Sequence, residues 1–236
     1  MLILAMDSTA VAASVALLDN GAPLAAFHLN NGNTHSETLL PMVESVLRCT
    51  GKTVNDIDLF AVSAGPGSFT GVRIGVATVK GLAFGKGKPC VGVSTLEALA
   101  ENLVPTGGLL CPVMNARRGQ VYNALFRAEN GALTRLCPDR ALSVEELEAE
   151  LLTYSEPVTL CGDGAEPVKN SFTKCNVALP PLTLMEQNAV SVALCAVRMA
   201  KEGKTCTDKE LKPVYLRMPQ AERERLQKLQ QTKEQS

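Results

Sequence analysis

The glycine-rich stretch GPGSFTGVRIG, residues 65–75, stands between an apolar run at 58–63 and a helical pattern at 72–84. A loop that follows a strand and opens a helix directs backbone N–H groups toward a site where an anion can bind. It is not a Walker A loop, because Val72-Arg73 stands where that motif needs Gly-Lys-Ser/Thr. A dinucleotide fingerprint needs an acid about 20 residues further on, and none lies between Asp58 and Glu97. Two interpretations stay open: an anion-binding loop, or a tight turn with close helix packing.

The segments before this loop predict strands and a helix. An apolar run at 2–6 ends in Asp7-Ser8-Thr9, and two further runs at 13–18 and 24–29 flank Asn20-Gly21, a strong hairpin signal. A helix is expected over 35–47. After the loop, the pattern predicts a strand at 89–93 and a helix from Ser94 to Leu103.

A second lobe in the same style follows a linker at 105–108. Its pattern predicts strands over 109–114, 121–127, 133–137 and 158–161, and helices over 143–152 and 188–200. The sequence therefore predicts an α/β protein of two lobes, each a mixed sheet with flanking helices. We divide it into an N-terminal lobe at 1–104, a C-terminal lobe at 105–219 and a polar tail at 220–236.

Composition and charge narrow the class of protein. The chain has 236 residues, of which 46% are hydrophobic, and its net charge of −1 argues against an autonomous basic nucleic-acid binder. Eight cysteines without a CxxC pair indicate buried free thiols in a reducing compartment. The N-terminus does not resemble a signal peptide, and no apolar run predicts a membrane span, so we expect a cytoplasmic protein.

Three polar or glycine-rich corners are candidates for a nucleotide or phosphate site, or for the remnant of one. A carboxylate and two hydroxyls at a strand end suit a hydrated Mg²⁺ or a phosphate, but the same residues make an ordinary polar turn. The glycine turn at 162–164 has the same two interpretations. The candidate residues are Asp7, Ser8, Thr9, Gly65, Gly67, Ser68, Gly162 and Asp163.

The sequence offers no catalytic or metal-binding set. His28 and His35 are its only histidines, and neither lies in the context of a catalytic nucleophile. A helical metal site would need a second ligand four residues after His35, where Leu39 stands. We therefore expect no metal site and interpret His35 as a hydrogen-bonded or capping residue.

The two helices of the first lobe carry more apolar residues than a single core-facing stripe needs. Either both helices are buried, or part of their surface meets another protein. The second interpretation predicts a partner interface made of Leu39, Met42, Val43, Val46, Val76, Val79, Lys80 and Ala83.

These segments together resemble the TsaB family of bacterial threonylcarbamoyladenosine biosynthesis proteins. GPGSFTGVRIG is the specific motif. The supporting motifs are LAMDST at 4–9, SVALL at 14–18, HSE at 35–37 with Leu40-Pro41, VSTLE at 93–97, ARRGQVY at 116–122 and PVYLR at 213–217. Asn115 departs from the Asp expected before Ala116-Arg117.

The resemblance implies an actin-like, sugar-kinase-like (ASKHA) fold and a non-catalytic partner of a TsaD-like catalytic subunit, with a TsaE-like ATPase joining the complex. That complex places threonylcarbamoyl on the adenosine beside the anticodon of tRNAs that read codons beginning with A. The TsaD relative carries a His-x-x-x-His metal pair where this chain has His35 and Leu39. The resemblance also implies that ATP and metal belong to partner subunits, that tRNA is met only through the complex, and that the free protein can pair with itself through the same lobe, with no membrane.

The alternative is a small ATP-dependent phosphotransferase of the same superfold. It would use Asp7, residues 65–71 and residues 162–164 around ATP and Mg²⁺, although no base for the acceptor hydroxyl is evident. Fold alone does not choose between the two functions.

Overall fold

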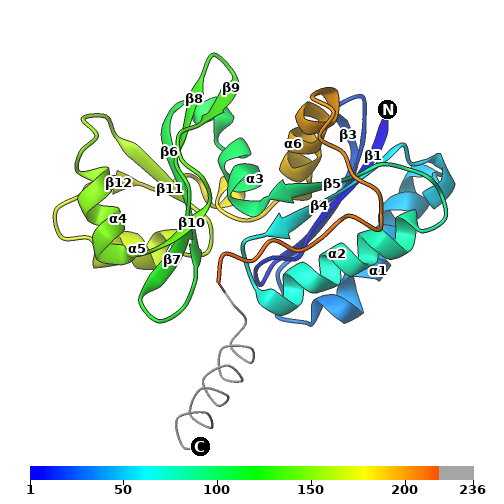
Figure 1. The fold of residues 1–236 in the computed structure, drawn as a ribbon, viewed down its shortest axis with the longest axis horizontal. Coiled ribbons are helices and arrows are strands. Elements are labelled where there is room, and N and C mark those ends of the chain that lie inside the picture. The colour runs from blue at the N-terminus through cyan, green and yellow to red at the C-terminus, as the bar shows by residue number, and fades with distance from the viewer. Residues whose placement is uncertain (218–236) are drawn as a thin grey trace, which may run out of the picture.

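Two β-sheets with flanking helices form the two lobes of the molecule (Figure 1). The computed structural model describes residues 1–217, so the predicted polar tail at 220–236 lies outside the described residues. Within residues 1–217, no helix combines the length and the apolar character that a membrane crossing needs. The predicted two-lobed α/β architecture with mixed sheets is confirmed.

The first sheet has five strands in the order β3-β2-β1-β4-β5. β1 pairs antiparallel with β2 and parallel with β4, so the sheet is mixed. Asn20 and Gly21 both have positive φ, which gives the predicted hairpin between β2 and β3. The strands are β1 (Leu2–Asp7), β2 (Ala13–Asp19), β3 (Ala22–Leu29), β4 (Leu59–Gly65) and β5 (Cys90–Ser94).

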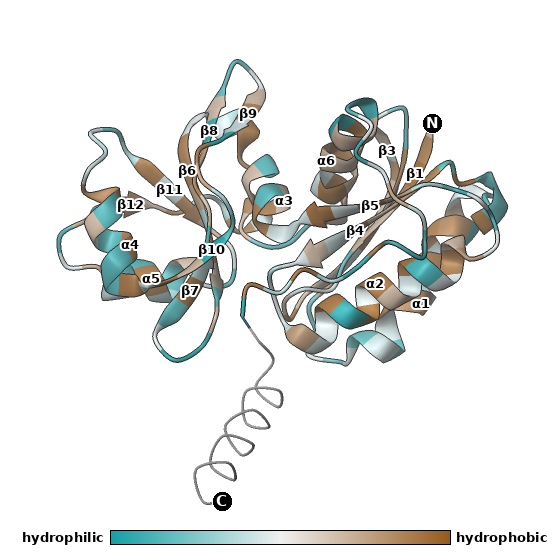
Figure 2. Cartoon of the chain, in the orientation of Figure 1, coloured by the Kyte–Doolittle hydropathy of each residue, from teal (hydrophilic) through white to brown (hydrophobic). Residues whose placement is uncertain are grey.

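Helices cover both faces of this sheet, which explains why β1 is apolar at consecutive positions. α1 (His35–Thr50) and α2 (Phe69–Ala83) pack on one face, against alternate residues such as Leu4 and Phe60. α6 (Ala189–Lys201) packs on the other face, against Ile3 and Ala61. In Figure 2 the central strands are mostly coloured hydrophobic, whereas α1 and α2 alternate between hydrophobic and hydrophilic positions.

The second sheet has seven strands, with β10-β7-β6-β11-β12 in order and β8 pairing with both β6 and β9. α4 (Val144–Leu151) and α5 (Ala165–Ser171) pack on one of its faces. The strands are β6 (Gly108–Asn115), β7 (Gln120–Asn123), β8 (Phe126–Glu129), β9 (Ala132–Arg135), β10 (Arg140–Ser143), β11 (Val158–Cys161) and β12 (Val177–Ala178).

Two helices pack across the expected boundary between 1–104 and 105–219. α3 (Thr95–Glu101) follows the first sheet but buries Leu96 and Leu99 against the second. α6 follows the second sheet but packs on the first, because its apolar stripe covers the sheet face opposite α1 and α2. Periodicity reveals such a stripe but does not reveal which sheet it covers.

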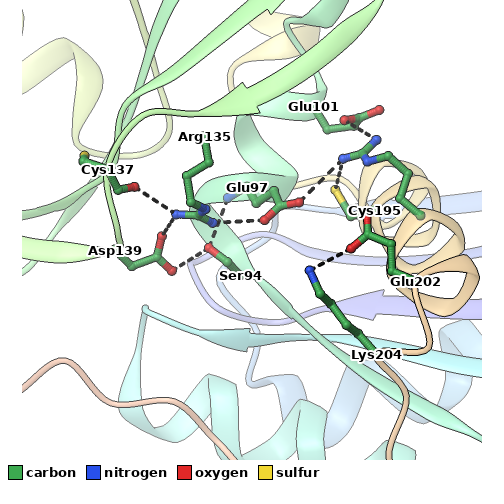
Figure 3. A network of polar contacts seen from close by, with 10 residues as sticks. Ser94, Glu97, Glu101, Arg135, Cys137, Asp139, Cys195, Glu202 and Lys204 are labelled. Atoms are coloured by element: carbon green, nitrogen blue, oxygen red, sulfur yellow. Dashed lines mark hydrogen bonds and ion pairs between the residues drawn. The ribbon is translucent and has the colours of Figure 1, made fainter.

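An ion-pair network joins the lobes where these two helices meet (Figure 3). Arg135 of β9 donates to Glu97 of α3 at 3.0 Å and to Asp139 at 2.5 Å. Arg198 of α6 lies 2.8 Å from the carboxylate of Glu101. Because these groups come from both sides of the junction, the network fixes how the lobes sit relative to one another.

Residues 206–217, here called the C-terminal strap, return across the first lobe toward the second (Figure 1). Cys206 pairs antiparallel with Cys90 through backbone hydrogen bonds of 2.8 and 2.9 Å. Further along, the amide of Val214 donates to the carbonyl of Ala64 at 2.7 Å. Arg217 then donates to the carbonyl of Ala116 at 2.7 Å, which ties the strap to the second lobe.

All eight cysteines are free thiols, as the sequence predicted. Four of them are fully buried, and Cys49 on α1 is exposed. Burial raises the pKa of Cys90 to about 11, so this thiol is a poor nucleophile at neutral pH.

Candidate functional site

A cavity of about 490 Å³ opens between the two lobes, beneath the C-terminal strap. Three parts of the chain line it. The first lobe contributes Thr9–Val11 and Pro66–Thr70, the second contributes Met114–Arg117, Tyr122 and Asp163, and the strap contributes Val214–Arg217. Of the predicted phosphate-site residues, Thr9, Gly67, Ser68 and Asp163 therefore face this cavity, whereas Asp7, Ser8, Gly65 and Gly162 are not among its lining residues.

Asp7 is completely buried at the end of β1, and both of its carboxylate oxygens have protein partners. One oxygen accepts hydrogen bonds of 2.8 Å from the amide and the hydroxyl of Thr9. The other accepts a short hydrogen bond from the hydroxyl of Ser63. Burial raises the pKa of the Asp7 carboxyl, while the bonds from Ser63 and Thr9 act in the opposite direction. This carboxylate organises the loop and does not present a free ligand to a cation.

Three backbone amides of the first-lobe loops donate to protein acceptors. The amide of Thr9 donates to Asp7, and the amide of Ser68 donates to the carbonyl of Thr9 at 2.7 Å. At the start of α2, the amide of Val72 donates to the carbonyl of Ser68 at 2.9 Å. A phosphate cradle needs such N–H groups to be directed at the ligand, so these groups do not form one.

Glycines 67 and 71 are required by close backbone approach. A Cβ on Gly67 would lie 2.6 Å from the carbonyl oxygen of Thr9. A Cβ on Gly71 would fall inside the contact distance of the carbonyl oxygen of Ser8, whose hydroxyl donates to the carbonyl of Gly71 at 2.9 Å. The glycine loop is thus pressed directly onto the corner after β1, which matches the close-packing interpretation of this motif.

The glycine turn at 162–164 in the second lobe is also held by hydrogen bonds to protein carbonyls. The amide of Gly162 donates to the carbonyl of Met185 at 2.8 Å, and the amide of Gly164 donates to the carbonyl of Val113 at 3.0 Å. Asp163 itself lines the cavity. Desolvation raises the pKa of its carboxyl, and the nearby charge of Asp7 adds to that effect. The amides of Gly162 and Gly164 are therefore not free to bind a nucleotide phosphate.

His35 forms a hydrogen bond to the loop that follows β1. Its Nε2 lies 2.7 Å from the carbonyl oxygen of Ala10, so this nitrogen carries the donated proton and ties α1 to the loop after β1. This confirms the hydrogen-bonded interpretation of His35. Leu39, one turn further on, is 1% exposed and packs in the core. No group of three metal-ligating side chains occurs in residues 1–217.

Most of the side chains predicted to form the partner interface are buried in the first lobe and do not reach its surface. Seven of the eight side chains are between 0% and 5% exposed: Leu39, Met42, Val43, Val46, Val76, Val79 and Ala83. The eighth, Lys80, donates through Nζ to the strap carbonyls of Lys209 and Leu211 at 3.2 and 3.1 Å. The helices carry extra apolar residues because α1 and α2 share one sheet face and bury surface against each other as well as against the strands.

Sequence reasoning assigned no role to the cavity's arginines or to the strap. Arg117, Tyr215 and Arg217 line the cavity, and the ring of Tyr215 stacks on Phe69 with centroids 4.7 Å apart. Both segments stand out only as family-like motifs, ARRGQVY and PVYLR. Neither has a periodic pattern or a chemical set from which a site is recognised.

The hydrogen bonds of Asp7 make a testable contribution to stability. Asp7→Ala leaves three buried donors without an acceptor, so we expect the free energy of unfolding to fall by about 1–3 kcal/mol. Glu44→Ala is the control, because it removes an exposed carboxylate from the surface of α1 and should change stability by about 0.5 kcal/mol or less. Urea denaturation measures both; equal losses would contradict the structural role of Asp7.

Comparison with known proteins supports the resemblance. Residues 30–224 match the family model described as TsaD, tRNA N6-adenosine threonylcarbamoyltransferase. The chain is 34% identical to tRNA threonylcarbamoyladenosine biosynthesis protein TsaB of Escherichia coli, over 92% of this chain and 95% of that protein. It is 41% identical to TsaB of Haemophilus influenzae, over 91% and 93%.

A solved structure agrees with these sequence matches. YeaZ from Pseudomonas aeruginosa superposes with a TM-score of 0.81 at 28% identity, covering 91% of this chain and 99% of that one. The two mixed sheets with their flanking helices confirm the predicted actin-like, sugar-kinase-like fold. With this fold, and with matches over nearly the full length of both relatives, the chain belongs to the TsaB family of tRNA threonylcarbamoyladenosine biosynthesis proteins.

Proposed function

We propose that this chain is a non-catalytic subunit of the tRNA threonylcarbamoyladenosine pathway that binds and activates a TsaD-like catalytic subunit. The observation that carries the proposal is the state of its loops: Asp7 is enclosed by Thr9 and Ser63, and the amides of Thr9 and Ser68 donate to protein oxygens. A protein whose loop groups are bonded to one another in this way is suited to docking. ATP and metal then act on the partner subunits, including a TsaE-like ATPase.

The same observation argues against the phosphotransferase alternative. The alternative placed Mg²⁺ at Asp7, and this carboxylate is completely buried with both oxygens bonded to protein groups, so it has no access to a cation.

The docking surface we propose is the solvent face of α1 and α2, here called the helix face. It consists of exposed or half-exposed apolar and small residues: Leu40, Ile74, Ala77, Gly81 and Phe84. Leu40 is 48% exposed and Phe84 is 72% exposed, so both offer apolar surface that a partner can cover. The small side chains at Ala77 and Gly81 allow the backbone of another helix to approach closely. In the free protein, the same face would pair with a second copy.

A charge on the helix face tests this proposal. Ala77→Asp keeps the fold, because Ala77 is exposed, but the new carboxylate loses its water when the partner docks. We expect the dissociation constant for the TsaD-like subunit of the same cell to rise by about one and a half decades or more. Calorimetry with size-exclusion chromatography measures it.

The matched control places the same change on the other lobe. Ala149→Asp also introduces a charge at an exposed helical alanine, on α4, and should leave the dissociation constant unchanged. If Ala77→Asp binds as tightly as the control, the partner docks elsewhere. If the wild-type protein does not bind the TsaD-like subunit, the proposed function is wrong.

A further inference from the structure

The mouth of the interlobe cavity carries an unusual concentration of arginine. Arg117 and Arg217 line the cavity, and Arg118 is the next residue along the same turn. Arg73 lies with its guanidinium carbon 4.9 Å from the ring centroid of Phe69, another lining residue. Among residues 1–217, Asp163 is the only acidic residue that lines the cavity. Within residues 1–217, none of these four arginines forms an ion pair with a carboxylate, so the mouth is positively charged although the whole chain is not.

Aromatic rings lie beside this charge. Of the chain's three tyrosines, Tyr122 and Tyr215 line the cavity. Tyr215 is 41% exposed, and its inner side is supported by Phe69. An exposed ring held in place by a second ring is a suitable platform for stacking by a planar base.

The turn that carries two of the arginines has an uncommon backbone. Arg117 and Arg118 both have positive φ, 63° and 56°, in a region that favours Gly or Asn. The hairpin between β6 and β7 would form more easily with Asn-Gly at these positions. Long cationic side chains at a place that disfavours them point to a role in binding.

Arginines neutralise phosphate charges, and an exposed aromatic ring stacks on a base. A site that combines the two is suited to bind a chain of nucleotides. A single free nucleotide fits less well, because the amides of Thr9, Ser68 and Val72 already donate to protein oxygens. Arg117 and Arg217 line the cavity, Arg118 follows Arg117, and Arg73 of α2 lies over the lining residue Phe69. The four arginines therefore come from three separate segments, as suits an extended polyanion.

We propose that this mouth, formed by Arg73, Arg117, Arg118, Arg217 and Tyr215, binds an RNA strand of the substrate tRNA while the chain is docked in the complex. The inference rests on the proposed function, since only the complex brings this chain to tRNA. Phosphates contact the arginines, and a base that is free of its stack lies on Tyr215. The modest net charge of the chain explains why the free protein need not hold RNA alone.

The experiment measures tRNA binding by the reconstituted complex at several salt concentrations. The Arg117→Gln/Arg118→Gln double variant should weaken binding and reduce the slope of log affinity against log salt by about 1 to 2. Tyr215→Leu should weaken binding about tenfold with little change in slope. Lys201→Gln, at an exposed lysine at the end of α6, is the control and should bind like the wild type.

Size-exclusion chromatography of each complex separates the outcomes. An intact complex with wild-type tRNA affinity and slope in both mouth variants overturns the inference and leaves the proposed function standing. Loss of assembly in these variants assigns the mouth to a protein partner and also overturns it. Saturable binding of ATP to the isolated chain, lost in the same variants, assigns the mouth to a free nucleotide and contradicts the RNA assignment. Failure of the wild-type complex to assemble contradicts the proposed function itself.

Discussion

Gly71→Ala is expected to destabilise the protein by about 3 kcal/mol or more, the cost of forcing atoms into a packed interior without room to relax. The added Cβ meets the backbone carbonyl of Ser8, which is fixed at the end of β1 and cannot rotate away as a side chain would. The hydrogen bond from the Ser8 hydroxyl to the carbonyl of Gly71 is strained by the same shift. Thermal and urea unfolding measure the loss.

The same helix supplies the control for this variant. Gly81 lies on the exposed side of α2, and a Cβ there meets nothing within 4 Å. Gly81→Ala should therefore stabilise the protein by up to about 1 kcal/mol through helix propensity. If both variants were neutral or stabilising, the close contact between the glycine loop and the corner after β1 would be refuted.

Val79→Asp should unfold the protein or lower its stability by more than about 4 kcal/mol. Val79 is 0% exposed between α2 and the first sheet, and it packs in an apolar cluster with residues such as Phe60 and Val62. A buried, unpaired charge is among the most costly substitutions. Circular dichroism against temperature and denaturant measures the effect.

Ala77→Asp is the control, two residues earlier on the exposed side of α2, and should remain folded. The pair separates a core position from a docking position on one helix. If Val79→Asp melted like the wild type, Val79 would have to lie on the surface, as the interface predicted from the sequence requires.

Local features of the fold were predictable because they rest on short-range chemistry. The hairpin at Asn20-Gly21 follows from the backbone preferences of those two residues. The loop was expected over 65–71 with a helix from Val72, whereas α2 begins at Phe69 with Ser68 as its cap. The role of the loop needed coordinates: the same sequence permits an anion cradle, and only the carbonyls of Ser8 and Thr9 reveal close packing.

Long-range features were not predictable from one sequence. Val46 and Val76 look like surplus apolar surface until both helices are placed on the same sheet face, where each buries the other's excess. The position of α6 on the first sheet is likewise invisible to periodicity. The C-terminal strap is held by single contacts, such as those from Lys80 to its carbonyls. Contacts of this kind leave no hydrophobic periodicity in the sequence from which the path of the strap could be predicted.

Threonylcarbamoyladenosine formation by the reconstituted system distinguishes docking from chemistry as the role of this chain. Product formation is measured while the concentration of this chain is raised against fixed TsaD-like and TsaE-like subunits. For Ala77→Asp, a docking role predicts that the half-saturating concentration rises by about one and a half decades or more, with the same plateau as the wild type. For Asp163→Asn, which changes the cavity's carboxylate, both the midpoint and the plateau should stay at wild-type values. A plateau abolished by Asp163→Asn at an unchanged midpoint would show that this chain takes part in the reaction and would refute a pure docking role.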